Sequence, residues 1–188
     1  QIDDENAPKY EDYAKRITDV ISEEAAKYNL PLPKLRIEPG RLISGPCGVA
    51  VGTVGAVKVG DKKKWVNLDL STNVLSWAAI LDWYYHAVPV ENTEREATET
   101  VDIVGPLCNS DEIGKQRKMP PLVRGEHVAF LDAGGYVESQ AARYNAQCLP
   151  ATVLVFNELS EITTEREQLR DVSGRFRVPP RLLAQSFG

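Results

Sequence analysis

The sequence predicts a mainly β protein with some α-helix, in the α+β class, whose larger part is a β-sandwich or barrel. After Pro46, β-branched residues alternate with Gly and Ala, and further strand-like runs follow at irregular intervals, as in sandwiches and barrels. With 188 residues, the chain is shorter than a whole (β/α)8 barrel, which takes about 250 residues. Its 43% hydrophobic and 26% charged residues predict that it folds.

The first part of the chain, residues 1–45, is predicted to be one helix and one strand. Apolar side chains in residues 10–28 recur at three- and four-residue spacings, which predicts an amphipathic helix. A Pro-rich connector ends this helix, and residues 34–37 are predicted to form a short strand. This order is that of the last unit of an α/β barrel, whose functional loops follow the strands.

The second part, residues 46–188, is predicted to be a C-terminal β domain. Its predicted strands are residues 49–59, 65–70, 87–90, 98–104, 127–131 and 151–156. Three lysines at 62–64 are expected at a solvated hairpin tip, and a short helix is expected over 75–85. A last helix is expected to open at 163–167, with a Thr N-cap, and to stop near Gly174.

Composition excludes several classes of function. The net charge of −5 argues against a nucleic-acid partner, and no apolar run approaches the roughly 20 residues that cross a bilayer. Three of the first five residues are acidic, where a signal peptide is basic. Three sparse cysteines and two histidines lack metal-ligand or disulfide spacing, so we expect no metal site and a cytoplasmic location.

Two segments carry candidate binding residues. The motif Glu-Pro-Gly-Arg at 38–41 is by itself most simply a turn. Its carboxylate and guanidinium could also grip a cofactor with a ring nitrogen and a phosphate. Likewise, Gly134 and Gly135 before Tyr136 fit either a turn with a packing tyrosine or a nest of N–H groups around an anion.

Cys108 is the candidate catalytic residue. A lone cysteine is most often buried and inert, but this one is followed by a polar run and preceded by Gly-Pro. A thiol with a pKa near 8.5 is protonated at neutral pH and can give a proton to a carbanionic carbon. A Cys-His catalytic pair with His86 or His127 is disfavoured, because both histidines lie in sequence contexts typical of structural residues.

Three separated motifs together resemble the C-terminal half of the diaminopimelate and ornithine decarboxylase family. They are residues 38–41, the Gly-Pro-Leu-Cys loop at 105–108, and Asp-Ala-Gly-Gly-Tyr at 132–136. These enzymes use pyridoxal 5'-phosphate (PLP) and have the alanine racemase-like fold type. The resemblance implies that Glu38 faces the pyridine nitrogen and that the phosphate is reached by Gly40, Arg41 and Tyr136.

The resemblance also implies roles across a homodimer interface. Cys108 would enter the neighbouring subunit's active site as the proton donor. A small L-amino-acid substrate would be touched by Asn109, Ser110 and Asp111. The diaminopimelate branch of the family would place the enzyme in lysine biosynthesis.

The resemblance is incomplete. No lysine here can be nominated as the PLP anchor, and the family's barrel and glycine-rich phosphate loop have no counterpart. We therefore expect the chain alone neither to bind PLP covalently nor to decarboxylate, unless a partner supplies the barrel. The family's residues for the distal end of the substrate are also replaced, and in their places stand Leu70, Trp77, Ala78, Leu81 and Asn109.

Two other hypotheses remain open. The chain could be a non-catalytic β domain, for dimerisation or partner binding, that retains the motifs. A racemase on the same fold is disfavoured, since it needs a Lys and Tyr pair that the sequence does not show.

Overall fold

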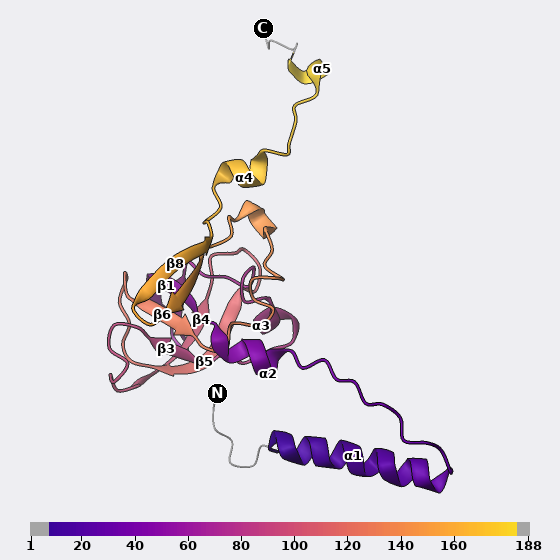
Figure 1. Cartoon of the computed structure of the whole chain (residues 1–188). Helices are drawn as coiled ribbons and strands as arrows, with labels where there is room; N and C mark the ends of the chain where they lie inside the picture. The colour runs from indigo at the N-terminus through magenta and orange to yellow at the C-terminus, as the bar shows by residue number, and fades with distance from the viewer. Residues whose placement is uncertain (1–7, 184–188) are drawn as a thin grey trace.

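The computed structural model describes residues 8–183. It shows a β body from which an N-terminal helix, a two-stranded hairpin and a C-terminal segment extend (Figure 1). The helix, drawn in indigo, lies apart from the body and is joined to it by an extended segment.

The predicted first helix is confirmed as α1, Tyr10–Lys27. At its start the Asp12 carboxylate accepts a hydrogen bond from the Lys9 N–H at 3.0 Å, and acidic side chains there oppose the positive end of the helix dipole. The apolar face is not covered, because Tyr10, Tyr13 and Ile17 are 41–57% exposed. A helix with one unpaired apolar face is built to pack against another element.

The strand predicted over residues 34–37 is wrong, since the structure has an extended connector there and no strand. A strand needs a neighbour to pair its N–H and C=O groups, and none of the described strands runs beside this segment. The connector leads into the short helix α2, Arg41–Ser44, and the 3-10 turn η1, Gly45–Cys47.

One six-stranded sheet forms the body, in the order β3-β6-β1-β2-β4-β5. Only β2 and β4 run parallel, and the other pairs are antiparallel. The outer strands β3 and β5 also approach one another, so the sheet curls toward a barrel. The strands are β1 (Ala50–Val59), β2 (Lys64–Leu68), β3 (Ala87–Pro89), β4 (Glu99–Val104), β5 (Glu112–Met119) and β6 (His127–Phe130).

The core lies inside this curled sheet, so the predicted mainly β, α+β class is confirmed. Fully buried apolar side chains come from five of the six strands and include Val54, Val66, Ile103, Ile113, Val128 and Phe130. The helix predicted over 75–85 is shorter than expected, and α3 spans Ser76–Ile80. The chain then continues as a loop that buries Tyr85 in the core.

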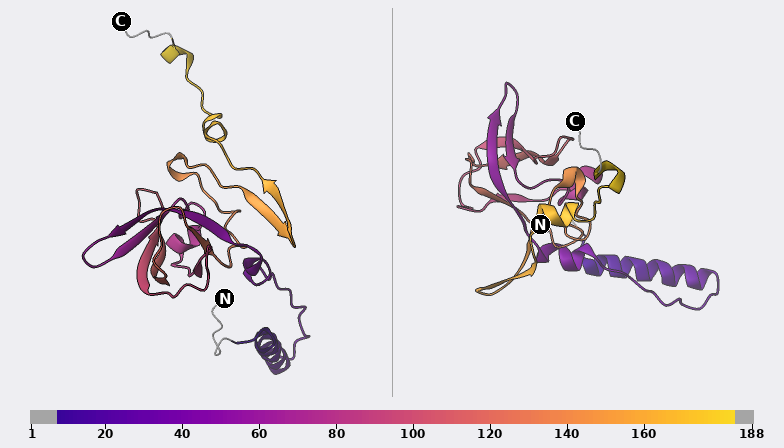
Figure 2. Two further views of the ribbon diagram at one scale, coloured as in Figure 1. Left: turned by 90° about the vertical axis from the view of Figure 1, so that its left-hand side faces the viewer. Right: turned by 90° about the horizontal axis from the view of Figure 1, so that it is seen from above.

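The predicted helix start at 163–167 is wrong, because a second strand occupies part of it. β7 (Thr152–Phe156) and β8 (Leu159–Thr164) form a hairpin that stands off the body (Figure 2). Asn157 takes a left-handed φ of 54° in the tight turn, a conformation that asparagine tolerates. Two short helices follow: α4, Leu169–Ser173, is followed by Gly174 as predicted, and α5 is Pro180–Leu183.

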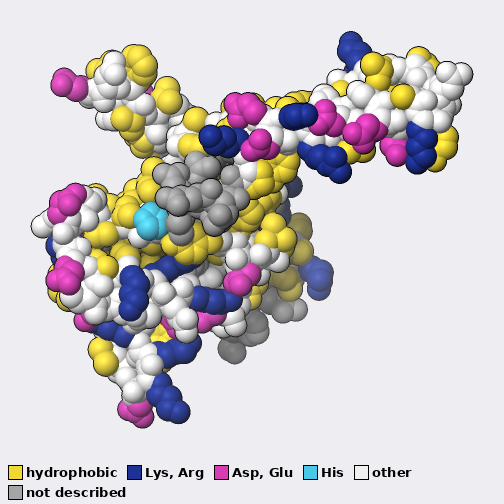
Figure 3. Space-filling model, turned by 90° about the horizontal axis from the view of Figure 1, so that it is seen from below, with side chains coloured by type: hydrophobic (Ala, Val, Ile, Leu, Met, Phe, Trp, Pro, Cys, Tyr) yellow, Lys and Arg dark blue, Asp and Glu magenta, His cyan; other side chains and the backbone are white. Residues whose placement is uncertain are grey.

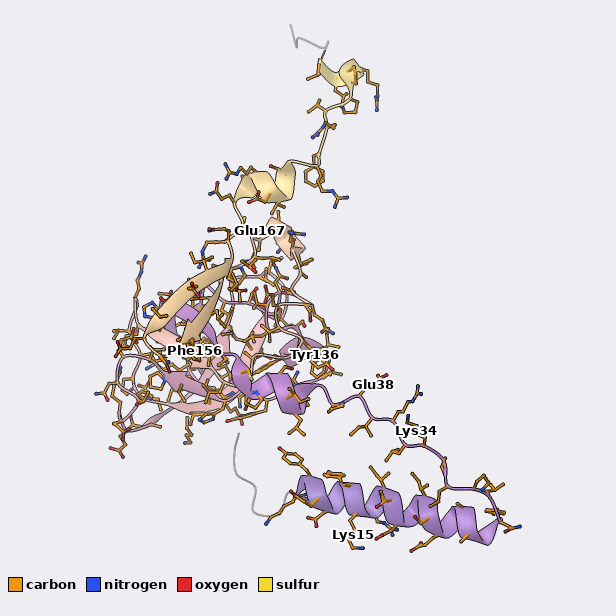
Figure 4. All side chains as sticks on the ribbon, in the orientation of Figure 1. Lys15, Lys34, Glu38, Tyr136, Phe156 and Glu167 are labelled. Carbon is orange, nitrogen blue, oxygen red and sulfur yellow. The ribbon has the colours of Figure 1, made fainter. Side chains whose placement is uncertain are left out.

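Glu167 ties the chain after the hairpin back to the body. Its carboxylate accepts hydrogen bonds from Arg143 Nε at 2.9 Å and from the Leu149 N–H at 3.0 Å. These bonds, the arginine's first, lower the pKa of Glu167 to about 2. Glu167 lies at the base of the C-terminal segment (Figure 4).

The lysine run at 62–64 lies at the hairpin tip between β1 and β2, as predicted, with Lys62 and Lys63 exposed and Lys64 partly buried. Lys64 pairs with Glu99 at 2.5 Å, and Lys63 Nζ donates to the buried Asp102 carboxylate at 2.8 Å. Asp102 also accepts the Gln116 N–H at 2.8 Å. Burial alone would raise the pKa of Asp102, but the Lys63 and Gln116 hydrogen bonds and the nearby lysine charges together lower it.

Within residues 8–183, no helix is long and apolar enough to span a bilayer. The same residues contain no cluster of three or more His, Cys, Asp or Glu side chains that could bind a metal.

Replacing Asp102 with Asn is expected to lower the free energy of unfolding at pH 7 by about 1 to 2 kcal/mol, because two hydrogen bonds to a charged acceptor are weakened. A lowered pKa means that the ionised form stabilises the fold above about pH 4 and that this contribution fades as pH falls. Denaturant titrations at pH 7 and in acid should therefore show a flatter pH dependence for D102N than for D61N, an exposed tip control. Equal slopes would contradict this role.

Candidate functional site

The guanidinium of Arg41 lies in a box of aromatic rings. Its Cζ atom is 4.3 Å from the ring centre of Trp77, 4.4 Å from Trp83, 5.4 Å from Tyr136 and 5.9 Å from Tyr85. Contacts of this length between a cation and ring faces are attractive. The box brings together α2, the α3 region and the turn after β6, which are far apart in the sequence.

The rings hold one another in place. Trp77 stacks on Tyr136 with centroids 4.3 Å apart and meets Trp83 edge-on at 5.6 Å. Its indole N–H donates to Gln140 Oε1 at 2.6 Å. The box is therefore a preorganised unit in which Trp77 makes contact with both the cation and the tyrosine.

The Arg41 side chain has hydrogen-bond donors that are not used. Nη1 donates to the Asp132 carbonyl at 3.4 Å, whereas Nε and Nη2 are buried and have no acceptor within the described part of the chain. A buried, unsatisfied donor costs free energy, and more so on a charged group. An anion with two oxygens would satisfy this pair of donors.

Close backbone packing places α2 and η1 against the turn after β6. The Ala133 N–H donates to the Gly48 carbonyl at 2.8 Å, and the Gly134 N–H donates to the Gly45 carbonyl at 3.0 Å. A Cβ on Gly134 would overlap the Ser44 carbonyl oxygen. The Gly134 N–H, which one of the two interpretations placed in an anion nest, is thus used within the fold, and this glycine serves close packing.

Three of the predicted binding residues converge here, and one does not. A Cβ on Gly40 would lie 3.2 Å from the Tyr136 hydroxyl, so Gly40, Arg41 and Tyr136 are neighbours. Tyr136 adopts a left-handed φ of 68°, which is unusual for a bulky residue. Glu38 is exposed near the end of the connector (Figure 4), and among the described residues no hydrogen bond or ion pair joins it to the other three.

Cys108 lies in a second cluster, on an exposed loop between β4 and β5. The amide of Asn145 donates to its Sγ at 3.3 Å. Asn109 and Ser110 are exposed beside it. The loop is polar and accessible, so the structure keeps the thiol out of the core.

Asp111 lies beneath this loop, and the predicted substrate contact through it stays untested. Its buried carboxylate accepts the Thr72 N–H and hydroxyl, both at 2.7 Å, and the Leu107 N–H at 2.9 Å. A Cβ on Gly105 would overlap this carboxylate, which explains the glycine of the Gly-Pro pair. Sequence reasoning missed Thr72, although a polar run directly after β2 was a visible signal.

Residues 71–73 connect the two clusters. Asn73 Nδ2 donates to the Tyr144 carbonyl at 2.9 Å, next to the asparagine that contacts Cys108. The Asn73 carbonyl accepts the Ala142 N–H at 2.8 Å, on the segment that follows Tyr136. Sequence reasoning also missed this asparagine.

The histidines are engaged elsewhere. His86 Nδ1 lies 3.2 Å from the Tyr84 hydroxyl, and His127 Nδ1 lies 2.5 Å from Glu91 Oε1. Among the residues that the structure describes, no hydrogen bond joins either ring to Cys108, and none joins Cys108 to Arg41. The chain thus carries a guanidinium cluster and a thiol cluster as two separate groups of side chains.

The fold and these clusters define the chain as the sheet domain of a PLP-dependent decarboxylase. Residues 13–134 match the family described as "Pyridoxal-dependent decarboxylase, C-terminal sheet domain". The chain belongs to this family.

The particular relatives are diaminopimelate decarboxylases. The enzyme of Methanothermobacter thermautotrophicus is 30% identical over 92% of the chain and 40% of its own length. The enzyme of Staphylococcus aureus is 35% identical over 90% of the chain and 40% of its own length. The M. jannaschii diaminopimelate decarboxylase, solved in co-complex with L-lysine, superposes with a TM-score of 0.83 at 30% identity over 95% of the chain and 41% of its own. The chain therefore spans about two fifths of these relatives.

Replacing Gly134 with Ala should destabilise the protein by about 1 to 3 kcal/mol, because the new methyl group meets backbone atoms that cannot rotate away. Gly55→Ala is the matched control, since the nearest atom to its Cβ is 3.8 Å away. Denaturant unfolding of both variants measures the difference. Equal stability of G134A and the unsubstituted chain would contradict the close-packing role.

Proposed function

We propose that the chain is the C-terminal portion of a PLP-dependent L-amino-acid decarboxylase, similar to diaminopimelate decarboxylase. Residues 1–45 are the last unit of its PLP-binding barrel and residues 46–188 its C-terminal β domain. The observation that carries this proposal is the buried pair of Arg41 donors without acceptors, beside Tyr136 and Gly40. The match to the family supports it.

The residues around Arg41 fit the phosphate of PLP. The guanidinium offers two donors to its oxygens, the Tyr136 hydroxyl faces the same space, and Gly40 leaves room because it has no side chain. Glu38, two residues earlier, is free to turn toward the pyridine nitrogen and keep it protonated. When bound, PLP supplies the electron sink that makes loss of CO2 from an amino acid feasible.

Cys108 is the proposed proton donor, acting in the active site of the other subunit of a homodimer. Its exposed thiol can reach a neighbouring molecule, and the Asn145 amide fixes its direction. Asn109 and Ser110 lie beside it to touch the substrate, while the three hydrogen bonds of Asp111 support a role in positioning the loop.

The missing barrel is the proposed partner of the exposed apolar surfaces. The uncovered face of α1 is one of them, and the hairpin presents Val155 and Phe156 at 67% and 69% exposure. Hydrophobic side chains are also visible across the underside of the body (Figure 3). Exposed apolar area of this kind is typical of interaction sites.

A non-catalytic domain for dimerisation or partner binding is the second candidate. The observation that favours it is that the cation–π contacts of Arg41 with the surrounding rings also hold α2 against the body, which is a purely structural role.

Replacing Cys108 with Ala in an enzyme completed by its barrel is expected to lower kcat by about 10²- to 10⁴-fold, the usual contribution of a general acid. Stability should hardly change, since the thiol is exposed. Cys47→Ala and Cys148→Ala are matched controls, because both of these thiols are exposed too. CO2 release from a panel of L-amino acids measures turnover. Full activity of C108A would exclude the donor role, and a PLP-loaded enzyme inactive on every substrate would favour the second candidate.

The isolated chain should form no covalent bond with PLP. After incubation with PLP and borohydride reduction, mass spectrometry is expected to find every lysine unmodified at stoichiometric cofactor. The completed enzyme should carry one reduced adduct outside these 188 residues. A single specific adduct on a lysine of this chain would overturn the expectation.

A further inference from the structure

A cleft lies between the loop after α3 and strand β5, with a volume of about 190 Å³. Trp83 and Tyr84 form one wall, and Lys115 and Arg117 form part of the other. Trp83 is also a wall of the Arg41 box. The cleft is therefore next to the proposed cofactor site but has its own lining and its own cation.

Arg117 is the side chain in this cleft whose hydrogen bonding is incomplete. Its guanidinium stacks on Tyr84, with Cζ 3.7 Å from the ring centre, and its Nε is buried and has no hydrogen-bond acceptor among the described residues. Burial lowers the pKa of Arg117, although Tyr84 and Asp82 oppose the shift. The stacked, planar cation is held still with an unused donor.

The two carboxylates that line the cleft, Asp82 and Glu112, act on Arg117 at most from a distance. Lys115 Nζ is paired with Asp82 at 2.7 Å. Glu112 also lines the cleft, but its charge acts on Lys115 and Lys63, whose pKa values are raised chiefly by their hydrogen-bonded Asp partners. Within residues 8–183, Arg117 makes no ion pair of 4.0 Å or less. A half-buried cation that has a buried donor without an acceptor and no ion pair favours an anion.

The backbone next to Arg117 is irregular. Gln116 takes a left-handed φ of 48°, and its N–H is held by the buried Asp102 carboxylate at 2.8 Å. Lys115 and Arg117 lie two residues apart on β5, and both line the cleft. Gly114 leaves the space for the arginine, because a Cβ there would be 3.0 Å from Arg117 Nε.

We propose that this cleft is a binding site for one small oxyanion, a carboxylate or a phosphate group, held by Arg117 against Tyr84. The guanidinium would donate to the oxyanion through Nε, with Lys115 adding long-range attraction. Trp83 separates this anion from Arg41, so the site is distinct from the proposed cofactor site. It requires neither PLP nor the barrel, and its test stands apart from that of the decarboxylase proposal.

The test is an NMR titration of the 15N-labelled chain that follows the arginine Nε–Hε signals. Sodium phosphate and sodium acetate are added in separate arms, each against sodium chloride at matched ionic strength. The Arg117 signal, assigned by its loss in R117Q, is expected to shift and saturate at millimolar anion. The arm that saturates at lower concentration identifies phosphate or carboxylate as the preferred group.

Arg124→Gln is the matched control, since Arg124 is exposed and lies outside the cleft. R124Q should leave the titration unchanged. Saturation in R117Q at other cleft signals, such as the Trp83 indole N–H, would overturn the proposal, as would a response to chloride equal to that of the oxyanions. If R117Q does not fold, R117K is used in its place to assign the Arg117 Nε–Hε signal. The titration of the unsubstituted chain then decides, because a shift of that signal that rises linearly and does not saturate excludes a site.

Discussion

The candidate site depends on the hydrogen bonds made by residues 71–73 directly after β2. Through Thr72 they satisfy the buried carboxylate of Asp111, which in turn holds the loop of Cys108. Through Asn73 they hold the segments around Tyr144 and Ala142. Because a buried carboxylate left without donors is costly, the loop geometry is coupled to the sheet and is not a free surface feature. Networks of this kind lose more than one bond when one member is removed.

The Arg41 cluster depends on a different constraint, the close approach of two backbone segments. Gly48 and Gly134 let η1 and the turn after β6 come within hydrogen-bonding distance. Only then do the side chains of Arg41 and Tyr136 meet over Trp77. Gly134 next to the tyrosine therefore serves close packing of two backbone segments, whereas anion binding by this motif stays a prediction.

Sequence reasoning predicted α1, the β-rich class and most strands, since these depend on local periodicity and on β-branched runs. It failed for β5, whose residues 112–119 are largely polar, and for β8, where a helix start was expected. In both cases pairing with a neighbouring strand overrides the local signal. The strand predicted at 34–37 fails for the opposite reason, because a strand-like sequence has no described strand to pair with.

The same logic separates the predictable part of the site from the rest. Short motifs pointed to Gly40, Arg41 and Tyr136, which the fold brings together. Thr72, Asn73 and Gln140 act through side-chain hydrogen bonds to residues more than thirty positions away. The polar run at 71–73 marks two of them as unusual, but no local pattern shows which distant residues they contact. Arg117 belongs to this class, because its isolation becomes visible only when every charge around the cleft is placed.

The uncovered face of α1 and the unpaired donors of Arg41 share one physical property, which is an unfavourable free energy in the chain by itself. Each costs free energy in the chain by itself, one through exposed apolar area and the other through buried polarity. Each cost disappears when a complementary surface or anion arrives. The chain spans about two fifths of the length of its relatives, and both features are what the proposed function expects of a part that meets a complementary barrel and a cofactor.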